Sequence, residues 1–206
     1  MARLHRPTPE LPAHLRSLYD RFPFDRSISQ DPVSCVRPYA PHPRAAEIAG
    51  LVAATLAIGN TTAIRASFAT FAQRAGPDLP RFVAGTTRSN WADRLGSFRH
   101  RWIRGDQLGY LAFRLHQTYD SYPSLEDVFL EGWDANGGFA GGLDALARQL
   151  RGAVGGGTPR SPVGYDRLFP SPLEPPPSPC KRLTLYVRWM RSSRRPPSRR
   201  IARGPA

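Results

Sequence analysis

Lys181 is the residue with the clearest capacity for covalent chemistry. It is the single lysine among 29 basic residues, and the other 28 are arginines. A lysine amine can lose its proton and attack a carbon to form a Schiff base, whereas a guanidinium stays charged. Three features disfavour its ammonium form: Arg182 beside it, the apolar helix face after it, and its place in the first turn of that helix. We therefore take Lys181 as a candidate catalytic nucleophile and Arg182 and Arg188 as candidate DNA contacts. A surface lysine without a role is the alternative.

A second candidate site interleaves aromatic and basic side chains. Residues 98 to 102 read Phe-Arg-His-Arg-Trp. Aromatic rings can stack on bases while arginines contact phosphates, so Arg99 and Arg101 are candidate DNA contacts. In the alternative interpretation, Phe98 and Trp102 are core residues on one helix face and the arginines lie outside it.

Other kinds of site are not predicted. The five histidines show no ligand spacing with cysteines or carboxylates, so no metal site is expected. Cys35 and Cys180 are too few for a disulfide framework or a four-thiolate iron–sulfur cluster, and we expect both to be reduced thiols. The glycines at 155 to 157 have no strand before them and no Lys-Ser/Thr after them, which excludes a phosphate loop. No cofactor is predicted.

The charge of the chain favours a polyanionic partner. Twenty-nine basic residues against sixteen acidic ones give a net charge of +13, which attracts nucleic acid. Nine of those cations, and no acid, lie in residues 181–206, so a basic tail accounts for a large part of the excess. DNA is therefore the predicted partner. The charge distribution does not indicate an oligomeric state.

The sequence predicts a cytoplasmic protein that does not cross a membrane. The longest apolar stretch, Ala45 to Ile58, contains Glu47 and is too short to span a bilayer. Residues 1 to 20 lack the apolar segment of a signal peptide.

The elements that must position these residues are predicted to be helices, which gives an all-α fold. Small and aliphatic residues on every face of 45–58 are typical of a helix at the centre of a bundle. No segment alternates long enough to place a strand. Further helices are expected where apolar residues repeat at helical spacing, at 11–22, 61–75, 106–119, 143–150 and 180–190, and after the capping pair formed by Ser124 and Asp127. Residues 78–83 are expected to form a short turn.

Three regions are predicted along the chain. Residues 1–152 form a helical core, and 153–190 form a Gly- and Pro-rich connection with the last helix. Residues 191–206 are basic, with too little apolar content to fold alone, and are expected to be a disordered tail.

Five segments carry a resemblance to a known family. In chain order they are LYDRF, DPVSCVRPY, EIAGLVAATLAIGN, SLEDVFLEG and CKRLTLYVRWM. They resemble the patterns of an uncharacterised bacterial family, known only as a conserved domain of unknown function, that is similar to the helix-hairpin-helix DNA glycosylase superfamily. The resemblance covers roughly Leu18 to Met190. It implies a helical bundle of that fold, with two lobes and a cleft for a flipped base.

The resemblance also implies roles for particular residues. In bifunctional members of the superfamily, a lysine opens the helix after the hairpin and attacks the sugar C1′, and CKRL places Lys181 there. A later Asp-Thr-His motif supplies an assisting aspartate, and this sequence does not contain it. Before Lys181, six prolines and no glycine stand where the hairpin uses glycines to approach a phosphate. We therefore expect that the C-terminal elements of the fold are missing, through truncation or a frameshift.

Together these observations predict a DNA-binding relative of base-excision DNA glycosylase/lyases, incomplete and weakly active or inactive as this chain. Two alternatives stay open: a non-enzymatic helical protein that binds nucleic acid, and a truncated product without function. Whether Lys181 reacts decides whether the protein is an enzyme.

Overall fold

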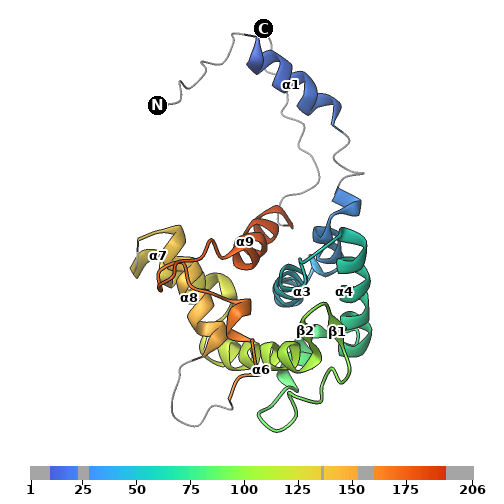
Figure 1. The fold of residues 1–206 in the computed structure, drawn as a ribbon, viewed down its shortest axis with the longest axis vertical. Coiled ribbons are helices and arrows are strands. Elements are labelled where there is room, and N and C mark those ends of the chain that lie inside the picture. The colour runs from blue at the N-terminus through green and yellow to red at the C-terminus, as the bar shows by residue number, and fades with distance from the viewer. Residues whose placement is uncertain (1–9, 23–27, 136, 153–159, 194–206) are drawn as a thin grey trace.

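The computed structural model of the chain, which describes residues 10–22, 28–135, 137–152 and 160–193, is mostly helical (Figure 1). The all-α prediction is confirmed at this level. The helices are α1 (Leu11–Arg21), α3 (Pro43–Thr55), α4 (Thr61–Ala75), α5 (Leu79–Ala84), α6 (Gly105–Ser121), α7 (Leu125–Ala135), α8 (Phe139–Arg151) and α9 (Lys181–Ser193). Three short 3-10 helices are η1 (Pro32–Cys35), η2 (Arg37–Tyr39) and η3 (Asp166–Leu168). Two-residue strands, β1 (Arg99–His100) and β2 (Ile103–Arg104), pair as an antiparallel hairpin.

Helix α3 lies at the centre of the molecule, between α4 and α9 (Figure 1). Every residue from Ala45 to Thr55 is buried, as its small and aliphatic composition predicts. Small side chains let neighbouring helices approach closely. At Gly50, an added Cβ would lie 2.9 Å from the Met190 Sδ of α9.

The segment after residue 159 contributes to the same core. Tyr165 and Phe169, on either side of η3, are fully buried, and Leu183 and Tyr186 bury the inner face of α9. The first three residues of the predicted tail, 191–193, complete α9. Residues 194–206, predicted to be disordered, lie outside the described residues.

The hairpin, α5 and the start of α6 differ from the expectations. Residues 79–84 form a helix rather than a turn, because Asp78 accepts a hydrogen bond from the Arg81 backbone N–H (2.9 Å) and caps it. Helix α6 begins at Gly105, one residue before the expected start at Asp106. Arg104 takes the capping position, and its backbone N–H donates to Gln107 Oε1 (3.0 Å). The capping pair before α7 is confirmed, since the Asp127 N–H donates to Ser124 Oγ (3.1 Å).

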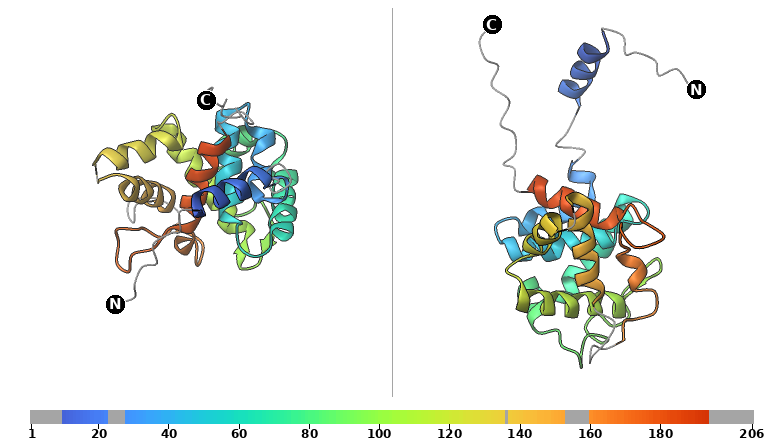
Figure 2. Two further views of the ribbon diagram at one scale, coloured as in Figure 1. Left: turned by 90° about the horizontal axis from the view of Figure 1, so that it is seen from above. Right: turned by 90° about the vertical axis from the view of Figure 1, so that its left-hand side faces the viewer.

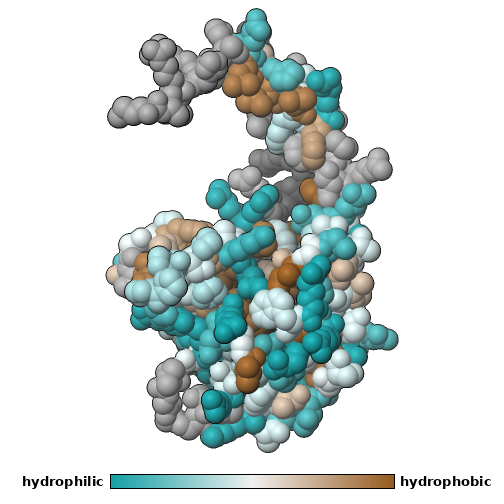
Figure 3. Space-filling model, viewed as in Figure 1, coloured by the Kyte–Doolittle hydropathy of each residue, from teal (hydrophilic) through white to brown (hydrophobic). Residues whose placement is uncertain are grey.

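Helix α1 forms where the leucine spacing predicts it, but none of its residues is buried. Figures 1 and 2 show it away from the other helices, and Figure 3 shows an apolar stripe along it. Its leucines, Leu11, Leu15 and Leu18, are exposed. Thr8 and Pro9, a hydroxyl and a proline of the kind that open a helix, lie outside the described residues. No helix in the described part of the chain is long and apolar enough to cross a membrane.

A buried carboxylate joins α3 to the start of α7. Glu47 Oε2 accepts hydrogen bonds from the Leu125 backbone N–H (3.2 Å) and the Tyr119 hydroxyl (3.3 Å). Arg44 covers the Tyr119 ring, with its Cζ 3.7 Å from the ring centroid. Burial raises the pKa of Glu47, although these hydrogen bonds oppose the shift.

The burial of α3 predicts that Leu51 is critical for stability. Leu51→Ala removes a fully buried side chain and leaves a cavity, so the free energy of unfolding should fall by about 2–5 kcal/mol. Urea denaturation measures it. Leu130→Ala, at an exposed position on α7, is the matched control and should change stability by less than about 0.5 kcal/mol. An equal decrease in the free energy of unfolding in the two variants would contradict the central place of α3.

The raised pKa of Glu47 predicts a pH-dependent effect of Glu47→Gln. A carboxyl whose pKa is raised by folding favours the folded state while protonated, and this contribution declines as pH rises through its folded pKa. The melting temperature of Glu47→Gln relative to the parent should therefore rise between pH 4 and pH 7. Thermal unfolding across that range tests it, with exposed Glu10→Gln as the control. Parallel pH profiles for Glu47→Gln and the parent would show that the burial of this carboxylate does not govern its ionisation.

Candidate nucleic-acid interface

The β1–β2 hairpin presents Trp102 at its tip. His100 pairs with Ile103, so Arg101 and Trp102 form a two-residue turn, with Arg101 at a φ of 53°. The pair next to the turn is fixed because Ile103 and His100 are buried, and His100 Nδ1 lies 2.7 Å from Ser67 Oγ. Trp102 itself is 44% exposed. Phe98 is a core residue, but the expectation that Trp102 shares a buried helix face with it is wrong, because the segment turns as a hairpin.

Arg101 lies against the loop that follows α3. Gly59 has a φ of +104°, and a Cβ there would lie 2.6 Å from Arg101 Nε. This close approach and the left-handed backbone both favour glycine. The Arg101 backbone carbonyl accepts a hydrogen bond from Arg99 Nε (3.2 Å), so the predicted contact Arg99 lies beside it and is exposed.

Arg182 connects three separate segments. Its Nε donates to the Thr55 carbonyl at the end of α3 (3.3 Å), and its Nη1 donates to the Leu168 carbonyl of η3 (3.4 Å). Its Cζ lies 5.2 Å from the centroid of the Trp102 ring, a cation–π contact. Burial lowers the pKa of its guanidinium. The predicted DNA contact Arg182 thus also positions the residues around it.

Lys181 is the first residue of α9 and is exposed. It lines a pocket of about 250 Å³ together with Ala57, Ile58, Gly59 and Arg182. The apolar face of α9 begins after it, at buried Leu183, and the Lys181 side chain lies outside that face. The preceding residue, Cys180, is buried, and its Sγ lies 3.0 Å from the Pro170 carbonyl.

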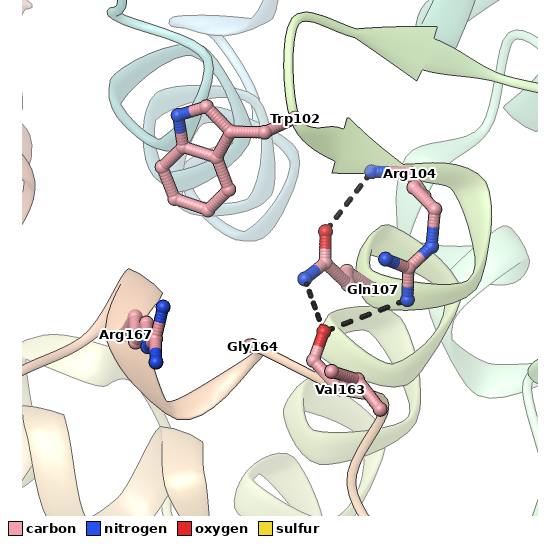
Figure 4. A pocket seen from close by; sticks show the side chains of 6 residues that line it. All are labelled: Trp102, Arg104, Gln107, Val163, Gly164 and Arg167. Atoms are coloured by element: carbon pink, nitrogen blue, oxygen red, sulfur yellow. Dashed lines mark hydrogen bonds between the residues drawn. The ribbon is translucent and has the colours of Figure 1, made fainter.

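A second pocket, of about 410 Å³, lies next to Trp102 (Figure 4). It is lined by Trp102, Arg104, Gln107, Val163, Gly164 and Arg167. Gln107 Nε2 donates to the Val163 carbonyl (3.0 Å), which holds this loop against the start of α6. Trp102 and Arg167 face the same space from the hairpin and from η3 (Figure 4).

These residues form one cationic surface around an indole, which we call the Trp102 face. It is made of Arg101, Trp102, Arg104, Arg167, Lys181 and Arg182. Figure 3 shows hydrophilic side chains gathered over α9, α3 and the hairpin, with smaller apolar areas between them. Of its cations, Arg104 alone is ion-paired within the described residues, with Asp106 (2.9 Å).

The structure therefore brings together only part of the predicted site. Lys181 and Arg182 line the smaller pocket, Arg101 lies against Gly59 of its lining, and Arg99 lies beside Arg101. Arg188 is exposed seven residues further along α9, away from both pockets. Arg104 and Arg167 were missed by sequence reasoning. Arg104 follows the aromatic and basic run closely, but Arg167 lies in an irregular segment that carries no signal.

Neither the two cysteines nor the possible metal ligands form a reactive site among the described residues. Cys35 and Cys180 are free thiols, and burial raises the pKa of each. Within the described ranges, no group of three or more His, Cys, Asp or Glu side chains could hold a metal ion.

Comparison with known proteins gives one match. A family described as a protein of unknown function, DUF2400, matches residues 31–194. No curated protein and no solved structure matches the chain.

Proposed function

The chain belongs to the DUF2400 family, whose function is unknown, and from the geometry of its Trp102 face we propose that it binds DNA there as a relative of base-excision DNA glycosylase/lyases. One observation carries the proposal. Lys181 lines a pocket on a surface where four further cations surround an exposed indole. Phosphates attract such cations and bases stack on indole rings.

Charge and exposure support the binding part of the proposal. Arg101, Arg167 and Lys181 are exposed, and none of them forms an ion pair with a carboxylate among the described residues. Cations that are not already neutralised can release counterions from a nucleic acid on binding. The net charge of +13 strengthens attraction at a distance.

The chemistry proposed for Lys181 is imine formation at a sugar. Its neutral amine attacks C1′, and the bond from C1′ to the base breaks as the base takes the electron pair and a proton. The C1′–O4′ bond then breaks, the remaining Nζ proton moves to O4′, and an imine between Nζ and C1′ is left with a free 4′-hydroxyl.

The likeness to helix-hairpin-helix glycosylases is part of this proposal. Only η3 precedes α9 as a helical element in residues 160–180, so a hairpin of two helices is not formed there. The start of α9 could still face a phosphate, because the first N–H groups of a helix are free to bind anions.

A non-enzymatic nucleic-acid-binding protein is the second candidate function. Lys181 is exposed, and an exposed amine is not desolvated in the way that strongly activates a lysine. The sequence also lacks the Asp-Thr-His motif whose aspartate would stabilise charge at the sugar. Both functions use the same surface, and they differ in whether the amine reacts.

Salt dependence tests the binding. The affinity for a short duplex should fall steeply between low and moderate salt, because each neutralised phosphate adds about 0.9 to the slope of log K against log salt. Removing residues 194–206 should flatten the slope without abolishing binding. In that shortened chain, the double substitution Arg101→Gln and Arg167→Gln should lower the slope by a further amount of about 2. The control Arg65→Gln, at an exposed position on α4, should change the slope by less than about 1. An affinity that does not respond to salt would contradict binding through phosphates.

Borohydride trapping on DNA that holds an abasic site tests the amine. The parent chain should trap weakly, and Lys181→Arg should abolish trapping while it keeps the charge and the salt-sensitive binding. Lys181 is the single lysine, so only the N-terminal amine could substitute, and acetylating that amine is the control. If Lys181→Arg traps as well as the parent, the amine is not the nucleophile, and the non-enzymatic function is the better account.

A further inference from the structure

Resting on the proposed function, we infer that the Trp102 face selects single-stranded over double-stranded nucleic acid. An unstacked base enters the 410 Å³ pocket against the Trp102 indole, and flanking phosphates contact the cations on the two sides of that ring. The observations that carry this are the exposed indole, the size of the pocket and the placement of the cations.

The indole is exposed yet held in place. Trp102 keeps 44% of its surface exposed, while Arg182 lies over its ring and buried Ile103 follows it in the hairpin. A ring that is already ordered loses little conformational freedom when a base stacks on it. Stacking of one base on such a ring contributes about 1–3 kcal/mol, and it needs the base to be out of its own stack.

The pocket matches one nucleotide and not a duplex. Its volume of about 410 Å³ is at the lower end of the range for small-molecule pockets. A duplex buries its bases in the stack, and taking one out breaks its pairing and stacking. A single strand offers the same base without that cost, so the pocket favours single strands.

Cations stand on both sides of the indole. Arg167 and Arg104 line the larger pocket, and Lys181 lines the smaller one. The contact between Arg182 and Trp102 lies between the two pockets, because each residue lines one of them. A strand whose base stacks on Trp102 therefore finds a cation for the phosphate before the base and another for the phosphate after it.

The polar groups of the pocket are mostly engaged within the protein. Gln107 Oε1 accepts from the Arg104 backbone N–H (3.0 Å), and Gln107 Nε2 and Arg104 Nη2 both donate to the Val163 carbonyl (3.0 and 3.5 Å; Figure 4). Apart from the Arg167 guanidinium, which the proposal assigns to a phosphate, few side-chain donors or acceptors of the pocket are left to read a base edge. The pocket should consequently bind by stacking and tolerate different bases.

Two tryptophans of similar exposure allow a controlled binding experiment. Trp102 is 44% and Trp133, on α7, is 43% exposed, so Trp102→Ala and Trp133→Ala remove similar exposed surface. Binding of the full chain to fluorescent oligo(dT), to a mixed-sequence single strand and to a duplex of equal length is measured at one salt concentration. The parent should bind both single strands more tightly than the duplex. Trp102→Ala should lose about 5- to 150-fold on the single strands and less than about twofold on the duplex. Trp133→Ala should match the parent.

Tryptophan fluorescence gives a second measurement that does not depend on Trp102→Ala folding. Oligo(dT) should quench the emission of the parent, and Trp102→Phe should remove most of that quenching while retaining binding. Heparin, a polyanion without bases, should quench neither protein.

The two proposals fail in different ways. Equal affinity for single strands and duplex, or equal losses in Trp102→Ala and Trp133→Ala, would overturn strand selection and leave DNA binding in place. Strong discrimination between oligo(dT) and the mixed strand would overturn recognition by stacking. If the parent binds none of the nucleic acids at low salt, the proposed function fails as well.

Discussion

The burial of α3 on every side is the constraint on which the other elements depend. A helix without a polar face cannot lie at the surface, so α4, α5, α9 and the 3-10 helices of residues 32–39 must all cover it. Gly50 lets α9 approach closely, and this fixes where α9 begins relative to the end of α3. Lys181 and Arg182 consequently lie beside the loop from Ala57 to Gly59. The pocket lined by Lys181 and Arg182 is thus a result of how α9 packs against α3.

Adjacent cations in α9 have different physical tasks. The planar guanidinium of Arg182 offers several donors in fixed directions, which suits two backbone carbonyls and an aromatic face at once. The ammonium of Lys181 ends a flexible chain and lies in solvent. An exchange of the two residue types would deprive the Thr55 and Leu168 carbonyls of a forked donor and would remove the amine from the pocket.

The sequence predicts the features that depend on neighbouring residues better than those that depend on contacts between residues far apart in the chain. Helices α3, α4 and α8 follow from local apolar spacing, and Ile64 and Phe68 are buried as that spacing indicates. The hairpin was missed because two-residue strands are too short for alternation to be visible. Local sequence indicates Arg182 as a candidate DNA contact but not its inward hydrogen bonds, because these join residues 127 and 14 positions away. The place of Arg167 in the site depends on the same long-range packing.

The six prolines of residues 170–179 have a consequence for the unfolded chain. Each proline fixes its own φ and restricts the residue before it, so the denatured ensemble of this segment samples fewer conformations. Folding then loses less backbone entropy here than it would in a glycine-rich loop of the same length. The chain leading into α9 therefore starts from a narrower set of backbone conformations before packing places Lys181.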